Sequence, residues 1–133
     1  MRIMLDTNIL ISIAIFNSEK LKQMLVDICD KHTLVLSSYV VEELESVVKR
    51  KFPSKVNNLA RFLYKIPYEL NYTPKEIIES TSVDIRDPKD LPILNSAIIS
   101  DVDIFITGDK DFDDVDIEKP EIMTATEFLK KYC

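Results

Sequence analysis

Short apolar segments alternate with longer amphipathic segments along this chain, and this alternation limits the fold more than any other feature. We expect strands at residues 2–5, 33–36, 104–107 and 122–123. We expect helices at residues 9–16, 18–31, 38–51, 56–66, 87–100 and 124–131. Strands separated by helices predict an α/β fold, a three-layer sandwich in which helices flank a central, mostly parallel sheet. The 133 residues match one domain, which we expect to span residues 1–133.

The third expected helix has a clear start and a clear apolar face. Ser37 or Ser38 would cap it, because a serine oxygen at the N-cap accepts hydrogen bonds from first-turn N–H groups. Its core face is expected to carry Val41, Leu44 and Val48. Thr124 or Thr126 would start the last helix in the same way. Residues 68–86 show no pattern that predicts an element.

Two aspartates follow expected strands directly. Asp6 follows the first strand and Asp109 follows the third. In parallel sheets ligands bind beyond the carboxyl ends of the strands, so both side chains should lie at that edge. Gly108, the only glycine, predicts an unusual turn before Asp109. Taken alone, Asp6 also fits the N-cap of a helix.

Three further acids have structural explanations of their own. Asp87 fits an N-cap, and Asp90 would then lie in the first helical turn, where the helix dipole favours a carboxylate. Glu42 points away from the expected core face of its helix. Glu43 and Glu45 flank that face on opposite sides, and spacing alone does not choose between them.

Clustered carboxylates repel one another unless cations neutralise them. Oxygen ligands without histidine or cysteine favour Mg²⁺ or Mn²⁺ over zinc. His32 is the only histidine, which excludes any two-histidine site. The chain has no glycine-rich phosphate loop and no serine or cysteine nucleophile motif. Metal-assisted chemistry on phosphates is therefore the best match to the acids.

The net charge is −6, which by itself disfavours a nucleic-acid partner, but the charges are unevenly distributed. Residues 46–68 contain no acid and hold six basic residues: Lys49, Arg50, Lys51, Lys55, Arg61 and Lys65. This stretch could contact phosphates, or it could be a solvated helix face. The sequence supports both interpretations equally.

Two cysteines, Cys29 and Cys133, are too few for a disulfide framework and suggest free thiols in a reducing compartment. No stretch approaches the ~18 apolar residues of a membrane span, and the N-terminus lacks the features of a signal peptide. We therefore expect a cytoplasmic protein without membrane contact.

Five segments in order resemble the motifs of PIN-domain ribonucleases. They are MLDTNIL at residues 4–10, SYVVEEL at 38–44, DLPILNSA at 90–97, ITGDKDF at 106–112 and TATEFL at 124–129. Each motif is weak alone, but the ordered set spans essentially the whole chain. Within the family, the chain is most similar to prokaryotic VapC-like toxins of toxin–antitoxin pairs.

The resemblance implies an endoribonuclease that cleaves single-stranded RNA with one or two Mg²⁺ or Mn²⁺ ions. It implies that the metal-binding and catalytic acids are Asp6, Glu43, Asp90 and Asp109. The supporting residues would be Asn8, Thr107, Asp111 and Asp87, and the basic residues Lys49, Arg50 and Lys51 would bind substrate. An antitoxin protein and a homodimer are open as partners, and an RNA-processing role is open beside the toxin role.

Two other functions are possible for a chain with these features. A catalytically silent PIN fold would serve as an RNA- or protein-binding module, but the complete acid set argues against it. A signalling receiver domain also gathers aspartates at the edge of a parallel sheet. It needs a phosphoacceptor aspartate after a middle strand, where this chain has Ser37 instead.

Overall fold

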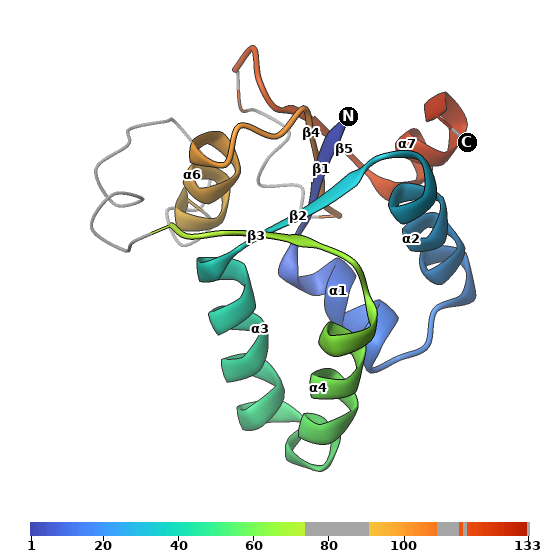
Figure 1. Ribbon diagram of the computed structural model, residues 1–133, viewed down its shortest axis with the longest axis vertical. Helices are drawn as coiled ribbons and strands as arrows, with labels where there is room; N and C mark the ends of the chain where they lie inside the picture. The colour runs from blue at the N-terminus through green and yellow to red at the C-terminus, as the bar shows by residue number, and fades with distance from the viewer. Residues whose placement is uncertain (74–90, 109–114, 116, 133) are drawn as a thin grey trace.

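The computed structural model describes residues 1–73, 91–108, 115 and 117–132. Its five strands form one sheet in the order β3-β2-β1-β4-β5, and every neighbouring pair is parallel (Figure 1). The strands are β1 Arg2–Leu5, β2 Thr33–Ser37, β3 Glu69–Asn71, β4 Ile104–Ile106 and β5 Glu121–Met123. The expected α/β fold with a parallel sheet is confirmed.

Helices cover the sheet on both sides. They are α1 Thr7–Ala14, α2 Glu19–Lys31, α3 Ser38–Lys51, α4 Val56–Lys65, α6 Leu91–Ile99 and α7 Ala125–Tyr132, with a 3-10 turn at Pro53–Lys55. In Figure 1, α6 lies on one side of the sheet and α2 with α7 on the other, while α1, α3 and α4 gather at the bottom of the view. Helix α3 packs against α1, α4 and α6, so it joins the helices on the α6 side to those below the sheet.

The chain starts its helices with the side chains that the sequence predicts. Ser37, not Ser38, caps α3 by accepting a hydrogen bond from the Val40 N–H. Thr124, not Thr126, caps α7: its hydroxyl oxygen accepts a hydrogen bond from the Glu127 N–H, and the Glu127 carboxylate accepts one from the Thr124 N–H. This reciprocal pair is a capping box, which satisfies two backbone donors that a helix start leaves without partners.

One expectation about packing was wrong in detail, and one strand was not expected. The core face of α3 centres on Val40, Leu44 and Val48, and Val41 is only half-buried. Strand β3 lies in the stretch that showed no pattern. It is a three-residue edge strand whose Glu69 and Leu70 are both exposed, so it lacks the apolar signature of a buried strand.

The expectation for Gly108 was also wrong. Gly108 does not have a positive φ, and a Cβ placed on it would meet no atom of the described residues within 4 Å. The backbone therefore adopts a conformation open to any residue, and neither a left-handed turn nor a close approach requires glycine here.

The core lies between the sheet and its helices. Its largest buried side chains include Phe105 of β4 and Phe128 of α7, with the apolar residues of β1 and β2 beside them. Among the residues that the structure describes, no helix has the length and apolarity that a membrane span requires.

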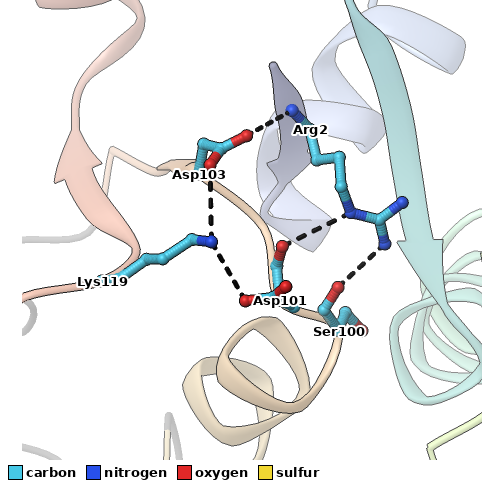
Figure 2. Close-up of polar contacts among 5 residues, drawn as sticks. All are labelled: Arg2, Ser100, Asp101, Asp103 and Lys119. Atoms are coloured by element: carbon cyan, nitrogen blue, oxygen red, sulfur yellow. Dashed lines mark hydrogen bonds and ion pairs between the residues drawn. The ribbon is translucent and has the colours of Figure 1, made fainter.

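A network of charged side chains closes the amino edge of the sheet (Figure 2). The Asp103 carboxylate accepts a 2.8 Å hydrogen bond from the Arg2 N–H, and the Lys119 ammonium lies 3.0 Å from Asp101 and 3.5 Å from Asp103. The Arg2 guanidinium donates to the carbonyl oxygens of Ser100 and Asp101, just beyond α6. These contacts join β1, β4 and the end of α6.

Candidate active site at the carboxyl edge of the sheet

The candidate site lies where the order of the strands reverses. Strand β1 is followed on one side by β2 and β3, and on the other by β4 and β5. Such a switch point leaves a crevice beyond the carboxyl ends of the two central strands. Asp6 follows β1 and Thr107 follows β4, and the Asp6 N–H donates to the Ile106 carbonyl at 3.0 Å. The topology therefore brings together two residues that lie far apart in the sequence.

Asp6 is held in one orientation by two donors. Its Oδ1 accepts a 2.8 Å hydrogen bond from the Asn8 N–H, and its Oδ2 accepts a 2.5 Å hydrogen bond from the Thr107 hydroxyl. The side chain is only 5% exposed. Asp6 is the N-cap of α1, so its structural role and its place at the switch point coexist. Burying an ionised carboxylate is costly, and hydrogen bonds to the charged form reduce that cost.

Residues next to Asp6 differ sharply in exposure. Asn8 is exposed, and its backbone N–H, not its side chain, donates the hydrogen bond that Asp6 accepts. Thr7 is 3% exposed, and its hydroxyl oxygen has no hydrogen-bond partner within the described part of the chain. Sequence reasoning did not single out Thr7, because a threonine after an N-cap residue is common and only burial makes it unusual.

Glu43 occupies the partly covered side of α3. It is half-buried, whereas Glu42 and Glu45 are exposed. The half-buried Val47 lies between Val40 and Glu43 around the helix, so the packed side of α3 extends toward Glu43 and leaves Glu45 in solvent. Helix α3 packs against α1, which begins beside Asp6, and against α6.

Hydroxyl side chains fasten α6 to this edge. Ser37, the last residue of β2, donates to the Ser96 oxygen at 3.0 Å, and Ser96 donates to the Ile93 carbonyl at 2.8 Å. Both serines are fully buried. Ser96 and its buried neighbour Asn95 were missed in the sequence, although two polar residues within an otherwise apolar helix were a usable signal.

Four of the predicted site residues lie outside the described residues: Asp87, Asp90, Asp109 and Asp111. Asp90 precedes the first residue of α6 in the sequence, and Asp109 comes two residues after Thr107. Within the described part of the chain, no group of three or more acids, histidines or cysteines is placed to hold a metal ion. Asp6 and Glu43 are the acids of the predicted set that lie within the described residues.

The basic stretch divides between two places. Lys49, Arg50 and Lys51 are exposed in the last turn of α3, where positive charge also complements the helix dipole. Arg61 and Lys65 of α4 instead line an open groove of about 460 Å³ between α1, α2 and α4. The six basic residues therefore do not form one continuous face.

The comparisons with known proteins agree with this geometry. The model of the PIN domain matches residues 2–111. The chain belongs to the PIN-domain family. The fold of this chain is also similar to that of a chain in a solved structure, the crystal structure of VapBC2 from Rickettsia felis bound to a DNA fragment from their promoter. The TM-score is 0.68 at 20% identity, over 92% of this chain and 97% of that chain. No match was found among curated proteins.

The described part of this PIN domain offers oxygen donors that match a hard divalent cation. Asp6 supplies a buried carboxylate at the switch point, Glu43 a half-buried carboxylate on the adjoining α3, and Thr7 a buried hydroxyl without a partner. Oxygen donors of this kind suit Mg²⁺ or Mn²⁺, which retain several waters when bound.

Proposed function

We propose that this PIN domain is a metal-dependent endoribonuclease that hydrolyses phosphodiester bonds of single-stranded RNA. The main support for the proposal is one observation: Asp6 is buried at the switch point of the sheet and is oriented by Thr107, which follows the neighbouring strand β4. A buried carboxylate held this firmly at a ligand-binding edge fits a binding role better than a purely structural one. As an N-cap alone, Asp6 would not need the Thr107 hydroxyl.

The metal ligands in this proposal are Asp6, Glu43, Asp90 and Asp109, with Asp87 and Asp111 as further acids beside them. The packing of α3 against both α1 and α6 supports it, because these three helices carry or follow Asp6, Glu43 and Asp90. A bound Mg²⁺ or Mn²⁺ lowers the pKa of a coordinated water and neutralises charge that develops on the phosphate.

The residues of the chain orient the carboxylates. Thr107 and the Asn8 N–H each occupy one oxygen of Asp6, which fixes the plane of the carboxylate. The Ser37–Ser96 contact holds α6, which Asp90 precedes in the sequence, against the end of β2.

Lys49, Arg50 and Lys51 are proposed to bind the RNA backbone. They lie about 9 Å or more along the α3 axis from Glu43. The same helix would therefore present a carboxylate to the reacting phosphate and basic side chains to the neighbouring phosphates. Replacing all three by alanine should weaken RNA binding and flatten its salt dependence by up to about 0.7 per lost phosphate contact. An unchanged slope would assign these residues to a solvated helix face.

The cellular role is proposed from the resemblance to VapC-like toxins and the shared fold with the VapBC2 structure. We propose residues 1–133 as one PIN domain acting in the cytoplasm, with an antitoxin protein as partner and a homodimer as its assembly. A small DNA-binding protein encoded directly upstream would support the toxin role over RNA processing.

Incubation of the purified protein with single-stranded RNA tests the activity. Cleavage is expected with Mn²⁺ or Mg²⁺ and none with chelator, because the carboxylates need the cation. Equal cleavage in chelator would contradict metal dependence. Binding of RNA without cleavage under any metal condition would support a catalytically silent module instead.

A further inference from the structure

Two buried hydroxyl groups have no hydrogen-bond partner within the described residues, and they lie at opposite edges of the sheet. One is Thr7 Oγ1, next to Asp6 at the carboxyl edge. The other is Ser100 Oγ, just beyond α6, where the carbonyl of Ser100 accepts from Arg2 in the network at the amino edge (Figure 2). Burial without a partner is unfavourable for a hydroxyl, so each of these groups needs an explanation.

The surroundings of Thr7 point to a role in the candidate site. Thr7 is the first residue of α1 and follows Asp6 directly. Helical spacing places it on the same side of α1 as Leu10 and Ile11, which are buried apolar residues that offer no side-chain partner. A hydrated cation at Asp6 would bring water to this end of the helix, and such water could accept the proton of the Thr7 hydroxyl.

We propose that Thr7 is a positioning residue of the metal site, whose hydroxyl hydrogen-bonds to a water of the ion that Asp6 binds. This inference rests on the proposed metal dependence and adds a residue to it. Divalent Mg²⁺ and Mn²⁺ usually keep several waters, so polar groups around the ligands contribute to affinity without touching the ion.

Manganese binding to matched variants tests the inference without any measurement of cleavage. Thr7→Val keeps the shape of the side chain and removes the hydroxyl, whereas Thr7→Ser keeps the hydroxyl. Ser100→Ala removes the other unpartnered hydroxyl and serves as the control at the opposite edge. The melting temperature of each protein is measured in chelator and across a Mn²⁺ titration, and the apparent Mn²⁺ affinity is read from the shifts.

In chelator, Thr7→Val and Ser100→Ala should melt no lower than wild type, because each loses an unsatisfied buried group. With Mn²⁺, wild type, Thr7→Ser and Ser100→Ala should bind equally, whereas Thr7→Val should bind roughly 10- to 100-fold more weakly, as for other groups that orient metal ligands. Equal Mn²⁺ affinity of wild type and Thr7→Val would overturn the inference and leave the metal site intact.

Other outcomes separate the two proposals. A wild-type protein that Mn²⁺ does not stabilise would contradict the proposed function, and with it the role of Thr7. If Thr7→Val does not fold, Thr7→Ala replaces it in the same titration. Weak Mn²⁺ binding by Thr7→Ala together with normal binding by Thr7→Ser would support the inference, and equal binding by the two would contradict it.

Discussion

At the amino edge of the sheet, charged side chains pair with one another near solvent, whereas at the carboxyl edge a buried carboxylate is held by a hydroxyl and a backbone N–H. Lys119 and Asp101 are 49% and 80% exposed in their side chains, while Asp6 is 5% exposed. Exposed pairs contribute little to stability because water and salt screen them, but a buried acid changes both stability and chemistry. The contrast teaches that the charged network at the amino edge joins elements of the fold, whereas the buried carboxylate at the other edge occupies the place proposed for binding.

The largest expected effect is on the rate of RNA cleavage, and one substitution at each edge of the sheet tests the difference between the edges. Asp6→Asn should lower RNA cleavage by at least ~10²-fold, because it removes charge from a proposed metal ligand. Asparagine also caps helices well, so the fold should persist. Asp103→Asn at the amino edge should leave the rate unchanged. Cleavage rates under single-turnover conditions with Mn²⁺ measure both, and equal rates for wild type and Asp6→Asn would indicate a contaminating nuclease.

The next effect concerns stability and metal together. If the four acids converge, Asp90→Asn should raise the melting temperature in chelator by relieving repulsion between like charges. Mn²⁺ at a hundredfold excess over its dissociation constant should stabilise wild type by about 2.7 kcal/mol and the variant much less. If Asp90 instead only favours a helix start, its loss should cost some tenths of a kcal/mol, and Mn²⁺ should affect neither protein.

A third change removes a hydroxyl that holds the carboxyl edge together. Ser96→Ala leaves the buried Ser37 oxygen without the acceptor for its proton, at a cost of roughly 1–3 kcal/mol in the free energy of unfolding. Urea denaturation measures the loss. Lys119→Ala at the amino edge provides the comparison and should change stability by no more than about 1 kcal/mol. A larger loss from Lys119→Ala than from Ser96→Ala would reverse the contrast between the edges.

The smallest effect is a pH dependence at the amino edge. The Arg2 N–H holds the pKa of Asp103 below its ordinary value, and the nearby Lys119 ammonium acts in the same direction. The folded pKa therefore lies below the unfolded pKa of about 3.9, so the stabilisation is complete above that pH and is lost as the pH falls through the folded pKa. Stability measured between pH 7 and pH 2 should fall less steeply below pH 4 in Asp103→Asn than in wild type. Parallel curves would show that Asp103 does not contribute.

Expectations for the helices and the buried strands depended on local patterns and were largely confirmed. The N-cap residue Ser37 and the amphipathic spacing in α2 and α3 are properties of neighbouring residues in the chain. Strand β3 was missed because an exposed three-residue edge strand has no apolar period, and its parallel pairing with β2 alone defines it.

In the candidate site, too, some features follow from the sequence and others only from the tertiary structure. The sequence by itself determined that acids follow strands. Its ordered motifs indicated the PIN-domain family, which the match to the PIN domain confirms. Only the tertiary structure decided that the Thr107 hydroxyl reaches Asp6, that Ser96 holds Ser37, and that the Thr7 hydroxyl is buried without a partner among the described residues. Each of the first two contacts joins segments that are distant in the chain. The pairing of β1 with β4 and the packing of α6 set these distances, whereas a local pattern constrains only residues within a few positions of one another.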